Sequence, residues 1–204
     1  MRKRDLEIIN NLEMFRVMSR NDIVDLHFSH LKNAVGNCNQ VLKRLVRDKQ
    51  IEVSTMHQPY VYFPPTNHIK KDSTKIPHFL KLVQVYKDLS KKEKPTTFQI
   101  EPKYRKGLAE PDIYTIFRGK PFFIEVQRSH YNQNQINDKL KRYEALKYSD
   151  IFNGTLPTII LITPTRYAID NDELTIIQTQ SIQALYGTPQ PQSQSHNGIK
   201  FRVG

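Results

Sequence analysis

The spacing of apolar residues divides the chain into two parts with different patterns. Up to about residue 50, apolar positions recur every three or four residues, as on one face of a helix. Ser19 and Asp22 have the spacing of a capping box that begins a helix. Two short runs rich in β-branched and aromatic residues follow. We expect helices over residues 4–15, from Ser19 to about Leu26 and over 32–49, then strands over 51–55 and 60–63.

The second part alternates apolar runs suited to strands with helical stripes. The predicted elements are a helix over 78–90, a strand over 96–101, a hairpin over 111–128 with its turn at Gly119, a helix over 132–148, and a strand over 158–163. Residues 174–178 then predict a strand and 181–185 a short helix, although a single helix over that span is an alternative. This order favours an α+β or α/β fold with a central mixed sheet.

The boundaries of the two parts follow from composition. We expect domains over residues 1–65 and 77–186, joined by a polar, basic linker over 66–76. The segment TPQPQSQSHN has low complexity, which predicts a disordered tail over 187–204.

Net charge indicates the class of partner. The chain has 31 Lys and Arg against 20 Asp and Glu, a formal charge of +11, which indicates a polyanion such as nucleic acid. No apolar run approaches the roughly 18 residues of a spanning helix, so no membrane association is expected. A single cysteine, Cys38, excludes an internal disulfide and a cysteine-based zinc site. We expect a cytoplasmic protein.

The third predicted helix has two chemically distinct faces. Val35, Cys38 and Leu42 belong to an apolar side that continues through Leu45 and Val46. The opposite side carries amides and arginines, the groups that contact base edges and phosphates. An ordinary solvated face is the alternative. The residues of this polar side are Asn33, Asn37, Gln40, Arg44 and Arg47.

Two carboxylates flank the predicted hairpin over residues 111–128. Asp112 stands at the start of its first strand and Glu125 near the end of its second, among β-branched and aromatic residues. Burying a carboxylate costs several kcal/mol unless a metal, an arginine or a raised pKa compensates it. The pair is therefore a candidate site.

The order of three helices and a hairpin resembles a winged helix-turn-helix domain over residues 1–65. That resemblance implies that the third helix enters the major groove of double-stranded DNA with the polar side listed above. It also implies that His57 and Gln58 lie at the tip of the wing. Winged helices serve as protein-interaction modules as well, which is the alternative.

The second part resembles the PD-(D/E)xK nuclease superfamily, which has the restriction-endonuclease-like fold. The resemblance rests on the element order and on Pro111-Asp112 followed by Glu125-Val126-Gln127. It implies that Asp112 and Glu125 bind Mg²⁺ or Mn²⁺ and that Glu101 or Glu110 supplies a further acid.

One position departs from the motif of that superfamily. Gln127 occupies the place of the lysine that orients water, and Lys139 or Arg128 could replace that cation. The pair of Lys139 and Tyr143 resembles a helix motif that contacts DNA in some members. The basic loop PKYRKGL adds candidate DNA contacts at Lys103, Arg105 and Lys106.

The complete arrangement, from about residue 5 to 186, resembles the replication-relaxation family of bacterial plasmids, phages and integrative elements. The resemblance implies a role in replication or mobilisation, with replication or relaxosome proteins as partners. The alternative is a non-catalytic transcriptional or assembly regulator whose second domain forms a homodimer or binds a ligand. If the DNA-binding protein of a mobile element is itself non-catalytic, the two acids are remnants or pair with Arg118, Arg128 or Lys139.

Overall fold

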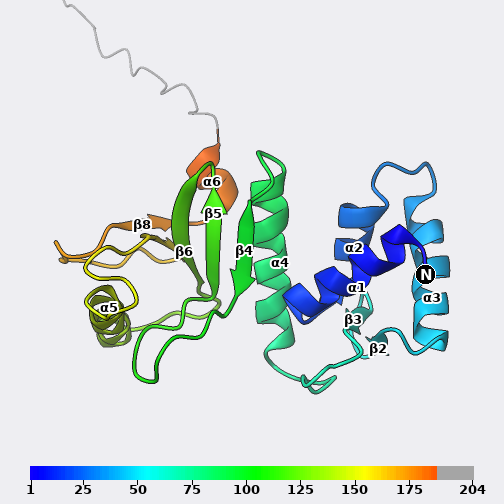
Figure 1. Cartoon of the computed structure of the whole chain (residues 1–204), viewed down its shortest axis with the longest axis horizontal. Helices are drawn as coiled ribbons and strands as arrows, with labels where there is room; N and C mark the ends of the chain where they lie inside the picture. The colour runs from blue at the N-terminus through cyan, green and yellow to red at the C-terminus, as the bar shows by residue number, and fades with distance from the viewer. Residues whose placement is uncertain (188–204) are drawn as a thin grey trace, which may run out of the picture.

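The computed structural model describes residues 1–187, which form a mixed α+β protein with six helices and two sheets (Figure 1). One sheet has three antiparallel strands and the other has five strands of mixed direction. Apart from Gly187, the predicted disordered tail lies outside the described residues.

The first part of the chain contains the three predicted helices and the predicted hairpin. Ser19 caps the second helix, and the side chains of Ser19 and Asp22 form the expected capping box. A short strand that the sequence pattern did not predict pairs with the hairpin and completes the smaller sheet, in the order β1-β3-β2. The elements are α1 (Lys3–Phe15), β1 (Met18–Ser19), α2 (Arg20–His27), α3 (Ala34–Arg47), β2 (Glu52–Ser54) and β3 (Val61–Phe63).

The second part contains the larger sheet, in the order β4-β5-β6-β7-β8. Strands β4, β5 and β6 are antiparallel, whereas β6, β7 and β8 are parallel. A strand followed by a short helix closes the fold, so the alternative of a single helix there was wrong. The elements are α4 (Ile76–Ser90), β4 (Thr97–Ile100), β5 (Ile113–Phe117), β6 (Lys120–Val126), α5 (Gln133–Lys147), β7 (Thr158–Ile162), β8 (Ile176–Thr179) and α6 (Ile182–Tyr186).

Helices cover both faces of the five-stranded sheet. Helices α4 and α6 pack on the face that carries Ile113, Phe117 and Ile124. Helix α5 packs on the opposite face, where Tyr143 joins Phe123 in a separate core cluster. Because side chains alternate along a strand, Glu125 shares the α5 face with Phe123.

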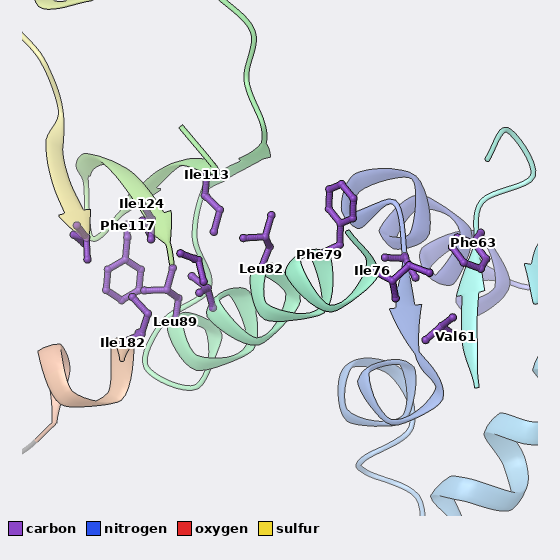
Figure 2. Packing of buried hydrophobic residues seen from close by; sticks show 14 residues of the cluster. Val61, Phe63, Ile76, Phe79, Leu82, Leu89, Ile113, Phe117, Ile124 and Ile182 are labelled. Carbon is purple, nitrogen blue, oxygen red and sulfur yellow. The ribbon is translucent and has the colours of Figure 1, made fainter. Parts of the chain in front are cut away.

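Helix α4 joins the two parts of the molecule through a shared core. One end of the helix packs on the sheet, where Leu89 lies near Phe117, and the other end reaches Val61 and Phe63 of the smaller sheet (Figure 2). The segment expected as a linker therefore leads into a helix that packs against both parts of the molecule. Within residues 1–187, no helix is long and apolar enough to cross a membrane.

Candidate functional site

The register of the β5–β6 hairpin brings Asp112 to the end of β6. Ile113 pairs with Ile124 across the two antiparallel strands, so Asp112, one residue earlier, lies beside the last residues of β6. The backbone N–H of Val126 donates to Oδ2 of Asp112 at 2.7 Å. This hydrogen bond fixes the carboxylate next to the strand that carries Glu125.

The other oxygen of Asp112 faces helix α4. Nε2 of His78 lies 3.1 Å from Oδ1 of Asp112, and both side chains are about one-fifth exposed. The hydrogen bond to Asp112 raises the pKa of His78, which favours a protonated ring beside an ionised carboxylate. The sequence analysis missed His78, because a single histidine at the start of a helix has no distinguishing pattern.

Glu125 is buried and accepts two hydrogen bonds from helix α5. The Tyr143 hydroxyl donates to Oε1 at 2.6 Å, and Nζ of Lys139 donates to Oε2 at 2.5 Å. Lys139 and Tyr143 are four residues apart, so they lie on the same face of the helix. Only 2% of the Glu125 side chain is exposed, whereas Lys139 and Asp112 are partly exposed. A ligand from solvent would therefore reach Glu125 from the side of Lys139 and Asp112.

Burial raises the pKa of Glu125 to about 7, although Lys139 and Tyr143 act in the opposite direction. The negative charge of Asp112 adds to the increase. For Lys139, burial lowers the pKa, but the attraction of Glu125 outweighs it, so the net change is upward and the amine stays charged. The site therefore combines a carboxyl group that titrates near neutral pH with a permanent cation.

Glu101 does not join the acid pair. Its carboxylate forms an ion pair with Arg16 of the first part, with 2.5 Å between Oε2 and Nη1. Its backbone N–H, in contrast, donates to the carbonyl oxygen of Asp112 at 2.9 Å. Glu110, the other acid considered, pairs with Lys103. Over residues 1–187, no three His, Cys, Asp or Glu residues are grouped to hold a metal ion.

Gln127 is the unusual polar residue of the site. Within the described chain, both its amide nitrogen and its amide oxygen are buried and have no hydrogen-bond partner. Buried polar atoms are nearly always paired in native proteins, so an unpaired amide here calls for a ligand, an ion or a water. Gln127 directly follows β6, and it lines a pocket together with Lys81 and Thr163.

A divalent metal fits these residues chemically. Mg²⁺ prefers oxygen ligands, and it is often held by one or two carboxylates while water and substrate phosphates complete its coordination. Asp112 and Glu125 supply two carboxylates, which is sufficient without a third acid. The metal would have to compete with Lys139 and Tyr143 for the oxygens of Glu125.

Tyr143 has a different place from the predicted DNA contact. Its ring has no exposed surface, packs against Phe123 and directs its hydroxyl to Glu125. The Tyr143 side chain therefore orients Glu125 from within the core and cannot contact DNA. Lys139, predicted with it, does reach the acid pair.

The exposed face of α3 is rotated relative to the predicted face, by about one residue along the helix. Arg44 turns toward α1, where it forms an ion pair with the buried Asp5, with 2.8 Å between Nη2 and Oδ1.

The other residues of α3 differ from the prediction in their exposure to solvent. Asn37 is partly buried, and Val35, expected in the core, is 44% exposed. Asn39 and Lys43, which the sequence analysis missed, are exposed instead. Gln40 and Arg47 are exposed as predicted, and Asn33 caps the helix through Gly36.

The remaining predicted contacts are at the surface but several have partners. Nε2 of His57 lies 3.1 Å from the carbonyl oxygen of Lys71, so the ring faces the linker. Lys103 pairs with Glu110, as described above, and Arg105 pairs with Asp150 at 2.6 Å. Gln58 and Lys106 are exposed.

The chain was compared with family models, curated proteins and solved structures. No family model, curated protein or solved structure matches it.

Proposed function

We propose that this protein binds double-stranded DNA and is a metal-dependent nuclease of the PD-(D/E)xK type. Asp112 and Glu125 would hold Mg²⁺ or Mn²⁺, and Lys139 would take the place of the motif lysine. The observation that carries this proposal is the convergence of Asp112, Glu125 and Lys139 from three separate segments onto one end of the sheet. Two acids can lie close together in a sequence by chance. Their proximity in the fold to a lysine from the following helix is not expected from chance and therefore supports the proposal.

Each residue of the proposed site has a chemical task. Lys139 is charged and 30% exposed, so it can approach both Glu125 and an incoming phosphate or water. Tyr143 fixes the orientation of Glu125, and the Val126 N–H fixes that of Asp112. When bound, a divalent ion would lower the pKa of a coordinated water and neutralise charge developing on the phosphate.

Helix α3 and the β2–β3 hairpin would form the DNA-binding part, as in a winged helix-turn-helix. Support comes from the three helices, the three-stranded sheet and the exposed amides and cations on α3. The resemblance to the replication-relaxation family suggests that the protein acts in replication or mobilisation of a bacterial plasmid, phage or integrative element. A replication or relaxosome protein would then be a natural partner.

A non-catalytic regulator is the second candidate, and one observation favours it. Both oxygens of Glu125 already accept hydrogen bonds, and no third acid joins the pair within residues 1–187. In such a protein the acids would serve as structural partners of Lys139 and His78. The second part would then dimerise or bind a ligand.

DNA binding is tested by measuring affinity for duplex DNA as a function of salt. Each phosphate neutralised by Lys or Arg contributes about −0.9 to the slope of log K against log salt. We expect a slope of several units. Binding that does not change with salt would contradict the charge argument, and no binding to any DNA would reject the proposal.

Metal binding is tested separately by calorimetric titration with Mn²⁺. We expect the wild-type protein to bind the ion and Asp112→Asn to lose most of the affinity. Because ionised Glu125 is needed, the affinity should increase as pH rises through about 7. Equal affinities in the two proteins would favour the regulator.

A further inference from the structure

A pocket lies between α3 and the hairpin of the smaller sheet, away from the acid pair. It has a volume of about 550 Å³, which is within the range of roughly 300–1,000 Å³ typical of ligand pockets. Leu42, Val46 and Val53 form its apolar lining, and Tyr60 and Tyr62 add two aromatic rings. The pocket is therefore large and apolar enough to receive a flat ring.

The charged side chains that line this pocket are basic. Arg20 and Lys43 contribute positive charge, and none of the lining residues in the described part of the chain is acidic. The backbone N–H of Arg20 donates to the carbonyl oxygen of Tyr60 at 2.9 Å, which places the two residues side by side in the backbone. The Arg20 guanidinium otherwise donates to its exposed neighbour Asn21. A group with an aromatic ring and an adjacent negative charge matches these features.

Amide side chains complete the lining. Asn39 and Gln58 are exposed at the pocket, and within residues 1–187 neither side chain forms a hydrogen bond with another residue. Free amides offer a donor and an acceptor side by side, the pattern that pairs with the edge of a nucleobase. Tyr60, at 41% exposure, presents a ring on which such a base can stack.

We propose that this pocket binds an unpaired nucleobase, with Tyr60 stacking on the base and Arg20 and Lys43 contacting the flanking phosphates. A base paired inside a duplex cannot enter a pocket between a helix and a hairpin. The protein therefore prefers DNA that contains an unpaired nucleotide to a continuous duplex of the same sequence. This inference rests on the DNA binding proposed above but not on catalysis.

The test compares three labelled probes by fluorescence anisotropy at one salt concentration: a duplex, the same duplex with one unpaired nucleotide, and the single strand. Stacking of one base on an aromatic side chain corresponds to a factor of about 5 to 150 in affinity. We expect that preference for the probes with unpaired nucleotides. A 2-aminopurine at the unpaired position should lose fluorescence intensity on binding, because stacking quenches it.

Variants assign the preference to the pocket. Tyr60→Ala should abolish it, whereas Tyr60→Phe, which keeps the ring, should retain it. Met56→Ala is the matched control, because Met56 is exposed on the same hairpin but does not line the pocket. Thermal melts by circular dichroism verify that each variant is folded.

The outcomes separate the two proposals. Equal affinity for all three probes, or a preference that survives Tyr60→Ala, overturns the pocket proposal and leaves duplex binding intact. Failure to bind any of the probes overturns DNA binding, and the pocket proposal with it.

Discussion

Glu125 is the residue whose surroundings have the clearest pH consequence. Burial raises its pKa to about 7, so between about pH 4.5 and 7 the folded protein holds a proton that the unfolded chain releases. Stability should therefore fall as pH rises through that window. The raised pKa of His78 also removes stability with rising pH, but only above about 6.5. Burial lowers the pKa of His27 to about 4, which adds stability as pH rises from about 4 to 6.5, so the contribution of Glu125 has to be measured as a difference between two proteins that both contain His27.

Glu125→Gln tests this prediction because glutamine has the same shape and does not titrate. In urea denaturation, the change in the free energy of unfolding from pH 4.5 to 6 should be more positive in the variant than in the wild type, because His27 contributes equally to both. Glu93→Gln, at an exposed acid, is the control and should follow the wild type. Parallel curves for Glu125→Gln and wild type would mean that Glu125 has an ordinary pKa.

Arg44 supports the packing of α1 on α3 through its bond to Asp5. Arg44→Ala should lower the free energy of unfolding by about 1–3 kcal/mol, because it leaves a buried carboxylate without its charged partner. Arg47→Ala should leave it nearly unchanged, because both Arg47 and its partner Asp48 are exposed. Equal effects in chemical denaturation would contradict the structural role of Arg44.

Sequence pattern could identify the acid pair but not its complete surroundings. Asp112 and Glu125 were found because a carboxylate beside apolar strands is costly and therefore noticeable. His78 and the inward position of Tyr143 depend on how α4 and α5 pack against the sheet, which no local pattern encodes. Glu101 was misplaced for the same reason, since its partner Arg16 is 85 residues away.

At the scale of elements, periodicity located nearly every helix and strand. The two-residue strand β1 was missed because it is too short to alternate. The outward face of α3 was rotated because Arg44 is polar yet paired with a buried acid, and polarity alone cannot distinguish such a residue from an exposed one. Val35 was assigned to the core because it is apolar, but it lies in the first turn of α3 and is 44% exposed.

The corrected face of α3 gives a prediction for DNA affinity. Lys43→Ala and Arg47→Ala should each weaken binding to duplexes of any sequence and reduce the salt slope by about 1, as expected for phosphate contacts. Lys92→Ala, an exposed cation in the turn after α4, should leave affinity and slope unchanged. Anisotropy titrations at several salt concentrations would measure both quantities. An unchanged slope for Lys43→Ala would remove α3 from the interface.

At the scale of the whole molecule, the two parts share one core through α4. Lys87 of that helix bonds to both Asp22 and Asp25 of α2, at 2.7 and 2.8 Å, and only 10% of its side chain is exposed. Phe15, Tyr86 and Phe98 form a contiguous aromatic cluster between α1, α4 and β4. These contacts couple the unfolding of one part to that of the other.

Coupling predicts a single cooperative transition for the full chain. In scanning calorimetry, the calorimetric and van't Hoff enthalpies should agree. Lys87→Ala should lower the midpoint, because it leaves Asp22 buried without its cation. Two separate transitions in the wild-type protein would show that the parts unfold independently.

The central claim is that Asp112 and Glu125 support metal-dependent cleavage of DNA. The most direct test is incubation of supercoiled and linear DNA with the protein in Mg²⁺ or Mn²⁺, using wild type, Asp112→Asn, Glu125→Gln and the control Glu93→Gln. We predict cleavage by the wild type and the control, none by the two site variants, and none in excess EDTA. Cleavage that persists in Asp112→Asn, or no cleavage of any substrate by a wild-type protein that binds DNA, would contradict the claim.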